Sequence, residues 1–173
     1  MQQTLLALVA ILTFSVFALQ QHEVAADVER FAITAEVEFA AQRLARQRLA
    51  TLLTYPFDEA DVGVTRVRTS PAGLSALGPD DGETADPHYD DVDDFHGAPA
   101  QTVSEPWMDG TIDFAQAATV RYVTLGASGV TGSAAPTLAK EVTVEVRAAP
   151  AGFIGTPPVA ARLSQVVTPS SQR

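Results

Sequence analysis

Length, composition and charge already exclude several classes of protein. The chain has 173 residues, with 21 acidic and 11 basic side chains, no cysteine and a formal net charge of -10. A chain this acidic is a poor candidate for binding nucleic acid, because phosphate binding needs a basic face. Without cysteine there is no disulfide framework, no thiolate nucleophile and no cysteine-ligated zinc site. The charge is also segregated, because residues 1–21 carry none and residues 56–115 carry 14 acidic side chains against two arginines.

The first segment, residues 1–21, predicts an apolar helix that lies in a membrane or in the core of a helical assembly. Residues 5–19 read LLALVAILTFSVFAL, and a helix of about 20 residues covers the roughly 30 Å apolar core of a bilayer. A cleavable secretory signal is the alternative, but no basic residue precedes the apolar run and no small-x-small site precedes Gln20. The absent basic region has another explanation, namely that Met1 is the first residue left after a basic leader was removed.

The second segment, residues 22–55, predicts an amphipathic helical stem that continues the first segment without a break. Residues 22–53 contain neither glycine nor proline, and their apolar side chains recur at helical spacing: Val24, Val28, Phe31, Ala35, Phe39, Leu44, Leu49 and Leu53. One helix is therefore expected from about residue 1 to about residue 54, where Pro56 ends it.

Charged residues along the stem are ordered, with acids first and arginines later. One interpretation is a solvated face in which side chains complement the helix dipole and each other. The other interpretation is that staggered parallel copies pair Glu36 with Arg46 and Glu38 with Arg48, an offset of ten residues or ~15 Å along the axis. The sequence leaves both interpretations open.

The C-terminal part predicts a small antiparallel sheet. Strand-like alternation of apolar and polar residues occurs in three segments: residues 117–125, 138–147 and 159–168. In the second of them Val142, Val144 and Val146 alternate with polar residues, as expected for a sheet with one buried face. Residues 56–115 are expected to form an acidic irregular connection, and residues 116–173 the sheet. The predicted fold is α+β, with the second half of the long helix packed on the sheet.

This layout resembles type IV pilins and the pseudopilins of type II secretion. The loop YDDVDDFHG (residues 89–97) resembles the acidic loop of minor pilins of the mannose-sensitive haemagglutinin type, and residues 140–146 and 163–168 resemble strand motifs of those proteins. The resemblance implies a structural subunit that leaves the inner membrane and polymerises into an extracellular filament on the cell surface. It implies as partners copies of itself, other pilins and the assembly machinery.

The following residues of the long helix are expected to contribute to assembly: Met1, Leu5, Leu6, Val9, Leu12, Phe14, Phe17, Glu36, Glu38, Arg46 and Arg48. The resemblance also implies that Met1 is methylated. Two departures from the family pattern stand out: Leu5 occupies the position of the usual glutamate, which in the family neutralises a neighbouring N-terminal amine, and His22 replaces the usual helix-breaking proline.

The acidic loop is the one cluster with ligand chemistry. Asp90, Asp91, Asp93 and Asp94 are candidate calcium ligands, although Phe95 stands where an EF-hand starting at Asp91 needs an oxygen ligand. An irregular calcium loop would draw further oxygens from Glu83, Asp86 or backbone carbonyls. The alternative is that these carboxylates cap turns by accepting backbone N–H bonds. Zinc binding through His88 and His96 is a weaker alternative, because no cysteine or third histidine lies nearby.

No enzymatic activity is expected. The chain contains neither a nucleophile-elbow sequence nor a phosphate-binding glycine loop. The predicted function is that of a pilin or pseudopilin without a cofactor. Two alternatives remain: a single-pass membrane-anchored extracytoplasmic binding domain that does not polymerise, and an enzyme with a metal-dependent acidic site.

Overall fold

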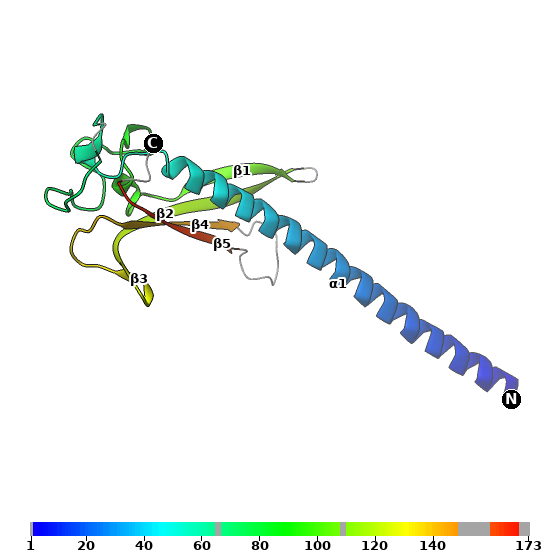
Figure 1. Cartoon of the computed structure of the whole chain (residues 1–173). Coiled ribbons are helices and arrows are strands. Elements are labelled where there is room, and N and C mark those ends of the chain that lie inside the picture. Colours follow the sequence, from blue (N-terminus) through cyan, green and yellow to red (C-terminus); the bar gives the residue numbers. More distant parts are fainter. Residues whose placement is uncertain (1, 65–66, 108–109, 149–159, 170–173) are drawn as a thin grey trace. The chain divides into compact units, whose positions relative to one another are not determined.

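The computed structural model describes residues 2–64, 67–107, 110–148 and 160–169, except the side chain of Ala160. The chain forms two compact units, Met1–Glu38 and Phe39–Arg173. Figure 1 shows one long helix, short turns of 3-10 helix and an antiparallel sheet. In chain order these elements are α1 (Gln2–Leu52), η1 (Glu59–Asp61), η2 (Asp86–His88), η3 (Asp93–Phe95), β1 (Gln101–Trp107), β2 (Gly110–Gly126), β3 (Gly129–Gly132), β4 (Lys140–Ala148) and β5 (Ala160–Val167).

The single long helix predicted from the sequence is confirmed, because α1 runs without interruption from Gln2 to Leu52. It passes through His22, where the resembling family usually has proline. The two polar side chains of residues 5–19 bond to their own helix: Thr13 Oγ1 donates to the carbonyl of Val9 (3.0 Å) and Ser15 Oγ to that of Ile11 (2.8 Å). Both hydroxyls thus have a partner within the helix and need none from outside it.

Helix α1 ends as expected before Pro56. The last backbone bonds tighten, with the N–H of Thr54 donating to Thr51 (3.0 Å) and that of Tyr55 to Leu52 (3.3 Å), because a proline cannot continue the ladder. The helix contacts β4 and β5. Its buried side chains within the second unit form one stripe at helical spacing: Ala41, Leu44, Ala45, Leu49 and Leu52.

The sheet is antiparallel throughout, with strand order β1-β2-β4-β5 and with β3 paired to the end of β2. The predicted alternation in β4 is confirmed, since Val142, Val144 and Val146 are fully buried. On the neighbouring strand Val120 lies opposite Val142 in the register and is also fully buried. The α+β fold predicted from the sequence is therefore the fold observed.

Two strands were missed. The prediction that residues 56–115 are irregular was wrong for β1 and for the start of β2, and β3 lies between two of the predicted strand segments, residues 117–125 and 138–147. Strand β1 includes Pro106 and lies at one end of the strand order. Proline is tolerated at a sheet edge because its missing N–H breaks no ladder bond there, yet in a sequence it argues against a strand.

Candidate functional site

The acidic loop of residues 89–97 folds around its own carboxylates. Asp91 Oδ1 accepts hydrogen bonds from the backbone N–H groups of Asp93 (2.8 Å) and Asp94 (3.3 Å). Asp94 Oδ2 accepts from the N–H groups of Asp90 (3.0 Å) and Asp91 (3.1 Å). Two of the four predicted calcium ligands thus have the turn-capping role that the sequence offered as the alternative.

This loop is fixed to the chain that leaves α1. The N–H of Val92 donates to the carbonyl of Pro56 (3.0 Å). The buried ring of Phe95 packs edge-to-face against Tyr55 and Tyr89, with ring centroids 5.1 Å apart in each case. Because Phe95 belongs to η3, these contacts hold the aspartates of that turn in a defined position.

A candidate cation position lies at the outer side of the loop. Carboxylate oxygens of Glu83, Asp90 and Asp94 come within 4.8 Å of one another. Three carboxylates supply fewer than the six to eight oxygens that calcium prefers, and calcium binding stays a prediction. Asp93 belongs to a different cluster, which is centred on Lys140. In the described part of the chain neither His88 nor His96 joins a group of three possible metal ligands.

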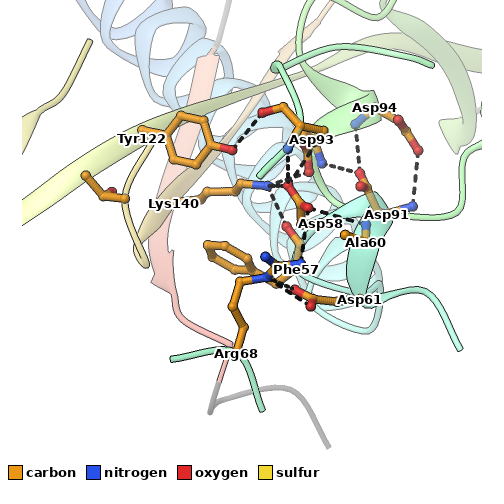
Figure 2. Close-up of polar contacts among 12 residues, drawn as sticks. Phe57, Asp58, Ala60, Asp61, Arg68, Asp91, Asp93, Asp94, Tyr122 and Lys140 are labelled. Atoms are coloured by element: carbon orange, nitrogen blue, oxygen red, sulfur yellow. Dashed lines mark hydrogen bonds and ion pairs between the residues drawn. The ribbon is translucent and has the colours of Figure 1, made fainter. Parts of the chain in front are cut away.

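The buried polar centre of the molecule is built around Lys140, at the start of β4. Its ammonium nitrogen Nζ lies 2.5 Å from Asp93 Oδ1, 2.6 Å from the carbonyl oxygen of Phe57 and 3.5 Å from Asp58 Oδ1. It also lies 4.4 Å from the ring centroid of Phe57 and 5.1 Å from that of Tyr122. Figure 2 shows these side chains converging on the lysine. Lys140 and Asp58 have no exposed surface, and Asp93 is 1% exposed.

Ser75 links the two aspartates of this cluster. Its hydroxyl oxygen lies 2.9 Å from Asp58 Oδ1 and 2.6 Å from Asp93 Oδ2, and its N–H donates to Asp58 Oδ1 (2.9 Å). Its carbonyl accepts from the hydroxyl of Tyr122 (3.1 Å). A serine hydroxyl has one proton to donate. The hydroxyl can therefore donate to only one of the two carboxyl groups at a time.

Carboxyl groups outnumber cations in this interior. Asp58, Asp91, Asp93 and Asp94 are all buried, and Lys140 is the buried cation among the described residues. Arg68 approaches from the edge, with 14% of its side chain exposed, and its Nη2 lies 3.8 Å from Asp58 Oδ2. Burying like charges together favours the protonated form of some of them.

The pKa values of the surrounding acids reflect this crowding. Burial, together with the charge of Asp93, raises the pKa of Asp91 to about 9. Burial also raises the pKa of Asp94 to about 6, partly opposed by the backbone N–H groups that it accepts. At the surface, a hydrogen bond with Asp90 raises the pKa of Glu59 to about 7. The loop therefore holds protons at pH values where free carboxyl groups have lost them.

Sequence reasoning missed this cluster, although one signal was present. Lys140 has the same parity as Val142, Val144 and Val146 in β4, so the alternation that buries the valines also buries the lysine. Lys140 is also the one lysine of the chain, the other ten bases being arginines. Asp58 and Ser75 carry no comparable signal, because they lie in irregular segments.

The predicted assembly residues of the apolar segment are exposed. Met1 lies outside the described residues, and the other six have 49–72% of their surface exposed: Leu5, Leu6, Val9, Leu12, Phe14 and Phe17. No described residue from Gln2 to Glu36 is buried. The helix is long and apolar enough to cross a membrane, a test that secretory signals near an N-terminus also pass.

The charged residues predicted to pair between copies differ in their surroundings. Glu36, Glu38 and Arg46 are exposed. Arg48 instead lies within its own subunit, with Nη2 2.9 Å from Asp86 Oδ1 and its guanidinium 5.2 Å from the ring centroid of Phe95. Glu36 and Arg46 are therefore the more accessible of the two proposed pairs.

Comparison of the chain with protein-family models, curated proteins and solved structures found no match. The likeness to pilins lies in architecture: a long N-terminal helix, apolar at its start, that packs on an antiparallel sheet.

Proposed function

We propose that this protein is a structural subunit, a pilin or pseudopilin, of a type IV pilus-like extracellular filament. Before assembly its apolar helix anchors it in the inner membrane, and afterwards the same helix lies in the filament core. Copies of itself, other pilins and the assembly machinery are its partners. Its role is mechanical and adhesive and involves no catalysis.

The observation that carries this proposal is the absence of buried residues over the first two thirds of α1. From Gln2 to Glu36 no described residue is buried, although residues 5–19 are almost entirely apolar. A helix that is apolar all round needs lipid or other helices around it. Exchange of lipid contacts for helix–helix packing satisfies this need, and the small residues Ala7, Ala10 and Ala18 permit close approach of neighbouring helices.

Leu5 favours a minor or tip subunit over the major one. An unpaired ammonium buried in an apolar core costs several kcal/mol, and Leu5 cannot neutralise the amine of a neighbouring copy as the family's glutamate does. At a filament tip no such neighbour is required. Elsewhere the amine needs methylation and hydration, or a polar group such as Gln2, Gln3 or Thr4.

The competing function is a membrane-anchored binding domain that never polymerises. The second unit has a cavity of about 280 Å³ beside η2. Its charged lining residues, Arg48 and Asp86, are paired with each other, and Gln101 also bonds to Asp86. Because its two charged lining groups are paired with each other, the cavity gives no specific support to the binding-domain alternative.

Electron microscopy of sheared surface material, with mass spectrometry of the N-terminus, tests the proposal. We expect the protein in fibres, and the mass of its N-terminal peptide tests whether Met1 is methylated. Leu12→Arg, which adds about 3 kcal/mol to membrane insertion at the helix centre, should remove the protein from both membranes and fibres. Gln21→Arg, at the end of the apolar run, is the matched control and should leave both intact. A wild-type protein found in membranes and never in fibres would support the binding-domain alternative.

A further inference from the structure

The chain places its one lysine where it has no access to solvent. All ten other bases are arginines, and Lys140 is 0% exposed between the rings of Phe57 and Tyr122. A guanidinium makes stronger and bidentate ion pairs with carboxylates. A primary amine differs in one respect that matters here: once deprotonated, it is a nucleophile.

The carboxyl group of Asp93 is positioned for reaction with this amine. Lys140 Nζ is in contact with Asp93 Oδ1 at 2.5 Å, and both groups are buried. Holding two reacting groups in contact replaces a bimolecular encounter by a step of very high effective concentration. The surrounding aromatic rings exclude bulk water, which is the reagent for the reverse hydrolysis.

A proton route also joins the two reactants. Asp58 Oδ1 lies 3.5 Å from the lysine Nζ and 2.9 Å from the hydroxyl of Ser75, which lies 2.6 Å from Asp93 Oδ2. The route thus begins at the amine and ends at the oxygen atom of Asp93 that does not contact the amine. Such a relay supplies general acid–base catalysis.

We propose that Lys140 and Asp93 become joined by an intramolecular isopeptide bond. One ammonium proton passes through Asp58 and Ser75 to Asp93 Oδ2, leaving a neutral amine and a carboxylic acid. The amine lone pair then forms the Nζ–Cγ bond, and a second nitrogen proton follows the same route to Oδ2. The Cγ–Oδ2 bond breaks, one water leaves, and the amide keeps Oδ1 and one N–H.

The bond explains two features of the buried cluster at once. It removes a buried positive and a buried negative charge, each of which is costly to keep out of water. It also connects β4 covalently to the acidic loop in a chain that has no cysteine for disulfides. Asp58 and Ser75 act on the reacting atoms during bond formation and keep their hydrogen bond afterwards. The bond forms within one subunit and does not depend on the proposed filament.

Mass spectrometry and lysine-specific proteolysis of the denatured full-length chain test the bond. We expect the peptides containing Asp93 and Lys140 to be recovered as one linked species, one water lighter than their sum. We also expect a lysine-specific protease to leave the chain uncut. Because Lys140 is the sole lysine, cleavage after it, with both peptides at their sequence masses, would overturn the proposal.

Variants test the reacting groups. Asp93→Asn should give a linked peptide of the same mass as the wild type, because the amide loses ammonia where the acid loses water and the products are identical. Asp58→Asn should slow linkage by about 100-fold, the range of one general acid–base group, whereas Asp61→Asn, outside the relay, should link at the wild-type rate. Wild-type linkage in Asp58→Asn would reject the relay. The wild-type peptide masses decide on the bond even if a variant fails to fold.

Discussion

Asp91 shows how a single buried side chain makes stability depend on pH. It is 1% exposed, it caps the turn of η3 through Asp93 and Asp94, and its pKa is raised to about 9. A carboxyl group with a raised pKa in the folded state contributes stability that is complete below its unfolded pKa of about 4. That stability is lost as the pH rises through the folded pKa of about 9.

Asp91→Asn therefore changes the pH profile in a predictable direction. The amide oxygen can accept the same two backbone bonds but never ionises, so the variant lacks the penalty that the wild type acquires with increasing pH. We expect the Tm of the variant minus that of the wild type to grow from pH 5 to pH 9 in thermal denaturation. Asp81→Asn, at an exposed position, is the control and should leave the profile unchanged. A difference that is constant with pH would contradict the prediction.

The same residue-scale crowding determines what the buried centre can do. Asp58 and Asp93 lie within ion-pair distance of the amine of Lys140, and Ser75 hydrogen-bonds to both aspartates. A cluster of this kind is weak evidence for stability, since desolvation can exceed the Coulomb gain. The proposed isopeptide bond uses these same contacts.

At the scale of elements, small side chains let α1 approach the sheet. Ala41 and Ala45 are completely buried, whereas Ala50 lies on the exposed side of the same helix. Because helix α1 contacts β4 and β5, any added volume on its buried stripe has to be accommodated by packed side chains. Protein cores are packed so closely that even a few extra carbon atoms change their stability.

Ala45→Leu should consequently destabilise the second unit by about 1–3 kcal/mol, the usual cost of overpacking. Denaturant unfolding of the full chain in detergent measures the change. Ala50→Leu introduces the same atoms at a solvent-exposed position of good helix propensity and should be nearly neutral. Equal effects of the two substitutions would show that the stripe is not packed as described.

For the whole molecule, the proposed assembly of copies gives the stem charges a testable role. Glu36 and Arg46 are exposed and lie ten residues apart, which is ~15 Å along the helix. The pairing interpretation places these two positions of neighbouring subunits side by side in the proposed filament. Arg48 is less available because it is paired with Asp86 of its own chain.

Charge reversal tests this contact between copies. Glu36→Arg or Arg46→Glu alone should lower the yield of sheared filaments about fivefold, equivalent to about 1 kcal/mol per subunit contact. The double variant should restore the yield. Glu23→Arg combined with Arg46→Glu should not restore it, because residues 23 and 46 are not ten residues apart and do not meet between copies. A double variant no better than either single variant would favour the other interpretation, a merely solvated face.

Sequence alone determined the elements whose signal is local. The absence of glycine and proline over residues 22–53 correctly predicted that α1 continues beyond the apolar segment. The alternation of valines correctly predicted the buried face of β4. Both patterns can be read from the sequence because helix and strand periodicities depend only on neighbouring residues in the chain. The segregation of charge likewise located the acidic loop. Strand β1 escaped prediction because Pro106 is acceptable only once the strand is known to lie at an edge.

Only the tertiary structure decided which side chains meet. The amine of Lys140 lies against Asp93, 47 residues away in sequence, and Asp58, 82 residues away. Such proximity depends on how β4, the end of α1 and the acidic loop pack, and no local pattern encodes it. The same packing divided the predicted calcium ligands, assigning Asp93 to the lysine and Asp91 to a turn. The sequence located the charges, and the fold decided which of them are buried together.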